Sequence, residues 1–237
     1  IRRFLIRPKW LGSRVSLESG IIAGLILILM LTYIAEFAGM SSKANWWVHT
    51  VALLSFLPVI PGTKHLHLLL SPAAVLLKHR EFAHVPPLQG DEDFGLDSGK
   101  DISRIAALQA FSCVECGRCM EQCPASATGK TLNPKEIALG FREYLKANGP
   151  GSAEPLLGVH LASEAAFQCT TCGACEAVCP VGVQHLPLII GLRRGAVNTG
   201  KWEDDHGADL FLKLERHGNP LGMSASERDK FIQKSNL

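Results

Sequence analysis

The chain has 237 residues, of which 47% are hydrophobic, and its formal net charge is only +2. Because no basic patch interleaved with aromatic residues accompanies this balance, we expect no nucleic-acid partner. Eight cysteines are present without the irregular spacing or the signal peptide of a secreted disulfide protein. We therefore interpret the thiols as metal ligands in a reducing compartment.

The first part of the chain, residues 1–84, is predicted to be a membrane segment with an interfacial N-terminus and spans at about residues 17–40 and 46–77. The apolar run Gly20–Met40 has 21 residues and a single charge, Glu36, and a bilayer core requires about 20 residues. A signal peptide is the alternative, but the run is too long for one and no small-residue cleavage site follows. We therefore predict a first transmembrane helix here.

The second span is less apolar than the first and contains Pro58 and Pro61. A proline inside a membrane helix is tolerated when neighbouring groups satisfy the freed carbonyl, so we predict one kinked spanning helix. The short connection between the spans holds only Lys43, whereas cations flank their outer ends: Arg2, Arg3, Arg7, Lys9, Arg14, Lys78 and Arg80. By the positive-inside rule both ends face the cytoplasm, which predicts an inner (cytoplasmic) membrane protein.

Residues 85–100 are rich in proline, glycine and acidic side chains and are predicted to be a linker. The remainder, residues 101–237, is predicted to be α-helical because no segment alternates as a strand would. Capping signals predict a helix from Asn133 to about Gly149. Further helices are predicted at Leu156–Phe167, Leu186–Val197 and Ala208–Arg216, with a capping box at Ser224 and Glu227.

All eight cysteines belong to two copies of the run C-x2-C-x2-C-x3-C-P, namely Cys113, Cys116, Cys119 and Cys123, then Cys169, Cys172, Cys175 and Cys179. This is the spacing of paired [4Fe–4S] clusters in ferredoxins, where the fourth cysteine of each run ligates the other cluster. Structural zinc is the alternative, but zinc sites pair C-x2-C knuckles without this series. The long step between the runs predicts a helical ferredoxin domain, and with every cysteine committed we expect no catalytic residue on this chain.

Two histidines of the second span, His49 and His67, are candidate haem ligands. They are 18 residues apart, which in one helix is five turns and about 27 Å, so they would share a face near opposite sides of the bilayer. Neutral imidazole is a common haem ligand. The alternative is that both are interfacial side chains near the helix ends. His65 lies on another face, and Lys64 is expected to snorkel to the interface.

The segment WWVHTVALLSFLPVIPGTKHLHLLLSP resembles the fifth membrane helix of the cytochrome b (gamma) subunit of respiratory nitrate reductase, where two histidines at this spacing serve two b haems. The segments CVECGRCMEQCPASATGKTLNPKEI, QCTTCGACEAVCPVGVQHLP and LERHGNPLGMSASER resemble the iron-sulfur domain of membrane-bound heterodisulfide-reductase-like oxidoreductases. That family fuses such a cytochrome to a two-cluster domain and commonly continues into CCG domains. The resemblance implies a mostly α fold with two transmembrane helices followed by an α-helical ferredoxin domain.

The resemblance also implies which residues hold which cofactor. It assigns His49 and His67 to two b-type haems shared with transmembrane helices outside this sequence, because the first span has no histidine. One cluster would be bound by Cys113, Cys116, Cys119 and Cys179, and the other by Cys169, Cys172, Cys175 and Cys123.

The function implied is electron transfer between quinone and a cytoplasmic flavoprotein, dehydrogenase or CCG-domain protein, with the ferredoxin domain on the cytoplasmic side and the substrate site outside this chain. The alternative is a membrane-anchored ferredoxin subunit without haem that tethers a soluble redox partner. The two interpretations share the clusters and differ in whether the membrane segment carries electrons.

Overall fold

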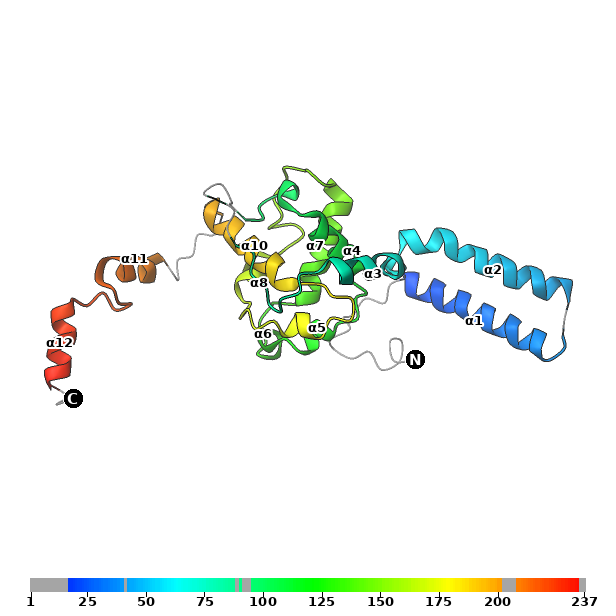
Figure 1. Ribbon diagram of the computed structural model, residues 1–237, viewed down its shortest axis with the longest axis horizontal. Coiled ribbons are helices and arrows are strands. Elements are labelled where there is room, and N and C mark those ends of the chain that lie inside the picture. The colour runs from blue at the N-terminus through cyan, green and yellow to red at the C-terminus, as the bar shows by residue number, and fades with distance from the viewer. Residues whose placement is uncertain (1–16, 41, 88–89, 91–94, 202–207, 235–237) are drawn as a thin grey trace. The chain divides into compact units, whose positions relative to one another are not determined.

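The structure is a computed structural model that describes residues 17–40, 42–87, 90, 95–201 and 208–234 (Figure 1). Every named element in these residues is helical, and the β-bridges among them are isolated. The predicted mostly α fold, with two candidate transmembrane helices ahead of the cysteine domain, is confirmed. The chain divides into two compact units, residues 1–198 and residues 199–237.

Helices α1 (Leu17–Phe37) and α2 (Lys43–Gly62) pack side by side as a hairpin (Figure 1). Both are long and apolar enough to cross a membrane, and only 11% and 6% of their apolar segments are buried within the protein. The core helix of a soluble domain would instead bury its apolar face. The outward-facing side chains therefore suit a lipid environment.

Polar contacts join the two helices near their connection. Ser42 is the N-cap of α2 and accepts a hydrogen bond from the backbone N–H of Asn45 at 3.1 Å. The Asn45 amide donates to the Thr32 carbonyl at 3.1 Å and to the Glu36 carboxylate at 3.2 Å, both on α1. Glu36, the single charge of the first apolar run, is thus held against α2.

The second predicted span is not one kinked helix over residues 46–77. Helix α2 ends at Gly62, and a 3-10 turn η3 (Lys64–Leu66) separates it from α3 (His67–Leu77). The break follows Pro61, which lacks an N–H donor and clashes with the preceding turn, and Thr63 then adopts an extended conformation. The prediction of a continuous helix was wrong because it treated both prolines as kinks.

The last described part of the predicted linker, residues 95–100, is integrated into the folded domain. The Leu96 N–H donates to the Gly191 carbonyl at 2.8 Å, and a Cβ added at Gly191 would lie 2.6 Å from the Leu96 side chain. The short turn η4 (Gly99–Asp101) follows, and its Gly99 N–H donates to the buried Tyr144 hydroxyl at 3.0 Å. This stretch is therefore part of the packed structure rather than a free connection.

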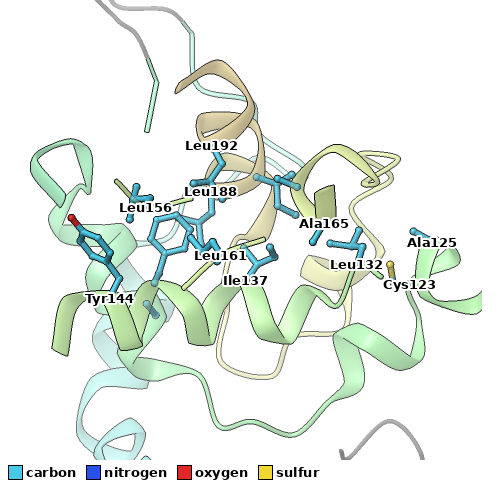
Figure 2. Packing of buried hydrophobic residues seen from close by; sticks show 14 of the residues in the cluster. Cys123, Ala125, Leu132, Ile137, Tyr144, Leu156, Leu161, Ala165, Leu188 and Leu192 are labelled. Atoms are coloured by element: carbon cyan, nitrogen blue, oxygen red, sulfur yellow. The ribbon is translucent and has the colours of Figure 1, made fainter. Parts of the chain in front are cut away.

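The core of the cysteine domain lies between four helices, α4 (Arg104–Ser112), α7 (Pro134–Asn148), α8 (Ser163–Phe167) and α10 (His185–Asn198). Figure 2 shows the apolar side chains that meet there. Burial of such side chains stabilises the fold by roughly 1.5–3 kcal/mol each. The buried set includes Phe141, Tyr144, Leu156, Leu161, Leu188, Ile189 and Leu192.

Local sequence signals placed α7 and α10 within a residue or two of their ends. Asn133 caps α7 by accepting from the Lys135 N–H at 3.1 Å, and Gly149 ends it at φ 77°. The predicted helix Leu156–Phe167 is wrong over its first part, because only Ser163–Phe167 is helical. Gly158, at φ 118°, interrupts the helix and allows an isolated bridge to form instead.

The second unit contains α11 (Ala208–His217) and α12 (Ala225–Lys234). The prediction of a helix from Ala208 to Arg216 agrees with α11 to within one residue. At the start of α12 the Ser224 N–H donates to the Glu227 carboxylate at 3.1 Å, which is one half of the predicted capping box. The side chains of α11 include exposed apolar groups, Phe211 among them.

Candidate iron-sulfur centres

The two cysteine runs fold into loops of the same backbone shape. Each loop leads into one short turn of helix, α5 (Arg118–Glu121) or α9 (Ala174–Ala177), and a third short helix, α6 (Pro124–Ala127), follows the first run. The glycine before each turn is left-handed, with φ 80° at Gly117 and φ 76° at Gly173. This backbone turn lets each loop place its first three cysteines around one centre.

A second left-handed residue occurs at equivalent positions of the two loops. Glu115 has φ 56° and Thr171 has φ 53°, although neither is a glycine. A left-handed backbone at a non-glycine residue costs of order 1–3 kcal/mol and persists where the surroundings require it. The loops are therefore shaped for the cysteines that they present rather than for their own backbone preference.

One cavity brings together three cysteines of the first run and one of the second. It is lined by Cys113, Cys116, Cys119 and Cys179, together with buried groups from α7 and α10. Burial raises the pKa of Cys119, and electrostatic coupling to the other three thiols raises it further, as expected when four sulfurs face one space. We call this space the Cys113 cavity. It offers the four-thiol donor set that a [4Fe–4S] cluster requires.

The remaining four cysteines group around the second loop. The Cys169 thiol interacts electrostatically with those of Cys172 and Cys123. The Cys175 thiol interacts in the same way with that of Cys169. Cys123, the last cysteine of the first run, is thus close enough to Cys169 to affect its pKa. Cys175 also interacts electrostatically with Cys119, so the two groups of cysteines lie next to each other.

Burial keeps several of these thiols protonated when no iron is bound. It raises the pKa of Cys113 to about 11 and that of Cys119 to about 12, and it raises the pKa of Cys169, Cys175 and Cys179 as well. A metal centre requires thiolates, so its binding must release these protons. The cationic iron of a cluster would then compensate the buried negative charge, which fits this donor set.

An arginine supports the first cysteine of each run. Arg142 on α7 donates to the Cys113 carbonyl at 3.3 Å and forms an ion pair with Glu115. Arg193 on α10 donates to the Cys169 carbonyl and to two carbonyls at the end of α8. The sequence pattern did not reveal this pair, because the arginines lie on distant helices and at different separations from the two runs.

Backbone N–H groups donate directly to cysteine sulfur in both groups. The Thr171 N–H lies 3.3 Å from the Cys169 Sγ, and the Val183 N–H lies 3.3 Å from the Cys179 Sγ. Hydrogen bonds to sulfur stabilise the thiolate form and are one of the means by which proteins set cluster potentials. Each group therefore has a donor placed by the fold.

The segment that follows helix α3 packs on the second loop. The His79 N–H donates to the Gln184 side-chain carbonyl at 2.9 Å, and the Gln184 amide donates back to the His79 carbonyl at 3.3 Å. Gln109 in turn bonds Gln184 at 3.2 Å. A Cβ at Gly173 would lie 2.7 Å from the Phe82 ring. We call residues 78–84 the covering segment, a feature that the sequence did not reveal.

Glu176 ties the covering segment to the cysteine domain. Its carboxylate accepts from the Leu186 N–H at 2.7 Å, and the N–H groups of Ala83 and His185 also interact with it. Burial raises the pKa of Glu176, while these donors and the nearby His84 act in the opposite direction. The carboxylate thus joins the covering segment to the start of α10 beside Cys175.

The two candidate haem ligands lie on different helices. His49 lies on α2, while His67 is the first residue of α3, so the five-turn spacing that put both on one face does not exist. The His49 Nδ1 lies 2.8 Å from the Thr32 hydroxyl, which itself lies 2.9 Å from the Ile28 carbonyl. If Nδ1 carries the proton and donates it to the hydroxyl, the hydroxyl donates to that carbonyl and Nε2 is left as the metal-binding atom.

The fold and the paired loops define a protein that binds two [4Fe–4S] clusters, and comparison with known proteins agrees. Residues 109–183 match the 4Fe-4S dicluster domain family. The chain is 32% identical to the probable iron-sulfur-binding oxidoreductase FadF of Bacillus subtilis (78% of this chain, 32% of FadF). It is 30% identical to the EtfAB:quinone oxidoreductase of Syntrophomonas wolfei (80% and 31%). The chain thus spans about a third of the length of these two relatives.

A third relative belongs to the ferredoxin:CoB-CoM heterodisulfide reductase of Methanosarcina mazei. This polypeptide is 31% identical, and the match covers 51% of the present chain and 67% of the relative. No solved structure matches the chain. The chain belongs to the heterodisulfide-reductase-like iron-sulfur proteins, a family of redox proteins.

Proposed function

We propose that the chain is a membrane-bound electron-transfer component of an oxidoreductase that connects a cytoplasmic donor to quinone through two [4Fe–4S] clusters and b-type haem. The observation that carries the proposal is that Cys179 of the second run lines the same cavity as the first three cysteines of the first run. Cys113, Cys116, Cys119 and Cys179 would bind one cluster, and Cys123 would complete the other with Cys169, Cys172 and Cys175. When bound, the clusters supply one-electron carriers at adjacent positions.

The membrane part of the proposal rests on the α1–α2 hairpin, whose apolar side chains are left exposed by the rest of the chain. Cations on the outer flanks of the hairpin favour a cytoplasmic position for the cysteine domain. The covering segment supports the same arrangement, because it continues from α3 directly onto the cluster loops. We propose the inner (cytoplasmic) membrane as the bilayer in which the hairpin has this orientation.

The redox partners are proposed from the relatives and from the chemistry of the domain. One relative is named EtfAB:quinone oxidoreductase, and we propose quinone as one partner of this chain. A flavoprotein, a dehydrogenase or a CCG-domain protein would be the cytoplasmic partner. The cysteines are all engaged at the two centres, so the substrate chemistry belongs to that partner.

The haem part of the proposal is best supported at His49. A metal-ligating histidine usually donates its second ring N–H to a fixed acceptor, and the Thr32 hydroxyl provides one within the hairpin. His67, at the start of α3, is proposed for a second haem. The opposite axial ligands would come from transmembrane helices outside this sequence.

An alternative function is a membrane-anchored ferredoxin subunit without haem, which would tether a soluble redox partner. One observation favours it: the break at Gly62 removes His67 from the helix that carries His49. In that case the hairpin would only hold the cluster domain at the membrane surface. The two functions make different predictions for the optical spectrum.

The cluster assignment is tested on the chain purified from membranes in detergent. We expect iron and acid-labile sulfide to match two four-iron clusters, and paramagnetic resonance after dithionite reduction to show two interacting centres. A Cys116→Ala/Cys172→Ala double variant is the control and should lose both signals. Iron content matching a single bound metal ion per cysteine group would instead indicate structural sites and overturn the electron-transfer proposal.

The haem assignment is tested in membranes that also contain the helices proposed to supply the opposite ligands. Reduced-minus-oxidised spectra should show b-haem bands, and His49→Ala should remove one haem. His65→Ala is the matched control and should leave the haem content unchanged. Absence of b-haem bands alongside full cluster content would favour the anchored ferredoxin.

A further inference from the structure

A buried histidine lines the Cys113 cavity without an assigned role. His185, the first residue of α10, is only 1% exposed, and its ring borders the same space as the four thiols. Its Nδ1 is buried and has no hydrogen-bond partner in the described part of the chain. A buried polar atom without a partner is energetically costly, so its position calls for a ligand that bonds it.

A buried lysine borders the same cavity from another helix. Lys135 lies in the first turn of α7, is only 7% exposed and lines the Cys113 cavity. The capped start of α7 fixes its backbone, because the Lys135 N–H donates to Asn133. The lysine ammonium is a compact positive charge, and beside this cavity it would be stabilised by negative charge. A cluster bound by four thiolates would provide that charge.

The residue that follows the third cysteine differs in charge between the two runs. Glu176 follows Cys175 directly and is partly buried beside it, while the equivalent residue of the first run is the uncharged Met120. The Cys172 thiol is exposed. The two loops share a backbone shape, so these differences come from side chains around them.

We propose that Lys135 and His185 raise the reduction potential of the cluster bound by Cys113, Cys116, Cys119 and Cys179, and leave that of the second cluster unchanged. This inference rests on the cluster assignment proposed above. Reduction adds one electron, and therefore one negative charge, to the cluster. An ammonium beside the cavity and an N–H donor both interact more favourably with the more negative state.

Histidine acts here as a neutral donor rather than as a second cation. Burial lowers the pKa of His185 to about 4, against a smaller opposing effect of the Val183 backbone. A neutral imidazole carries one N–H, and with that proton on Nδ1 the ring can donate a hydrogen bond to sulfur. Lys135 supplies the charge, so its removal should have the larger effect of the two. The electron would rest preferentially on this cluster when the pair is singly reduced.

The experiment is a redox titration, followed by paramagnetic resonance, of the purified chain with its clusters, with dithionite as the electron donor. Cys116→Ser and Cys172→Ser variants each perturb one cluster and so identify the two signals. We expect Lys135→Met to shift the reduction equilibrium of the first cluster at least tenfold toward the oxidised state, which is about 59 mV for one electron. His185→Phe should shift the same cluster in the same direction by less.

Two controls separate this effect from a general disturbance. Lys146→Met removes an exposed lysine from the same helix α7 and should leave both potentials unchanged. Lys135→Arg keeps the charge and should retain most of the wild-type potential. If Lys135→Met fails to load iron, Lys135→Gln provides the same removal of charge with a polar side chain.

Unchanged potentials of both clusters in the Lys135 and His185 variants would overturn the inference, as would equal shifts of both clusters. Failure of the cluster assignment has a different signature. In that case the wild-type chain would lack two four-iron clusters, or Cys116→Ser and Cys172→Ser would perturb the same signal. Iron analysis of each sample, made before the titration, distinguishes the two outcomes.

Discussion

The two cysteine loops have the same backbone and different surroundings. Both place a non-glycine residue and then a glycine in the left-handed region, and both are held by an arginine at the first cysteine. The first loop borders the buried Lys135 and His185, whereas the second lies under the covering segment and beside Glu176. A repeated spacing thus fixes the shape of a cluster site, whereas a residue inside the run and segments outside it set its charge and its exposure.

The largest expected effect comes from replacing the last cysteine of each run, which is proposed to bind the cluster of the other run. Cys179→Ala should abolish the cluster of the first loop and keep that of the second, because Cys179 faces the Cys113 cavity. Cys123→Ala should have the opposite result. Iron content and paramagnetic resonance measure both. If Cys179→Ala instead removed only the cluster held by Cys169, Cys172 and Cys175, ligation would be local and the loops independent.

Arg193 and Arg142 should contribute unequally to the stability of the cysteine loops that they support. Arg193→Leu removes hydrogen bonds to three carbonyls, at Ala166, Phe167 and Cys169, and should destabilise the second loop by about 2 kcal/mol. Arg142→Leu removes one carbonyl contact and the ion pair, so we expect a smaller loss. The rate at which a chelator extracts iron from each variant measures the difference. Equal rates would show that the ion pair with Glu115 matters as much as the extra bonds.

Substitution of the second loop's glycine tests the contact with the covering segment. Gly173→Ala would bring a Cβ to 2.7 Å from the Phe82 ring, at a backbone φ of 76°. The left-handed backbone alone costs roughly 1–2 kcal/mol. Gly129→Ala is the control, because it has φ 83° and open space around it. The thermal midpoint should fall further for Gly173→Ala, and equal falls would mean that Phe82 moves aside without cost.

The smallest expected effect concerns the attachment of the covering segment itself. Gln184→Ala removes both hydrogen bonds to the His79 backbone, a loss of about 1 kcal/mol. Trypsin should therefore cut after Lys78 and Arg80 about fivefold faster. Glu143→Ala changes an exposed side chain of α7 and serves as the control. Unchanged cleavage in Gln184→Ala would show that other contacts hold the segment.

Local signals in the sequence were sufficient for several elements. The cap at Asn133 and the glycine at Gly149 predicted the ends of α7, because both act on hydrogen bonds within one turn. The apolar length of α1 likewise depends on its own residues. The cysteine spacing predicted a two-cluster domain, which the family match confirms. The assignment of each cysteine to a particular cluster stays a prediction, as does that of His49 and His67 to haem.

By itself, the sequence determined the mostly α fold, the apolar hairpin and the paired cysteine runs, since each depends on residues that are close together in the chain. Only the tertiary structure decided that residues 95–100 belong to the core. It also decided which groups border the Cys113 cavity, including Lys135 on α7 and His185 on α10. Those contacts join residues tens of positions apart. No local pattern encodes them, because they arise only when helices pack.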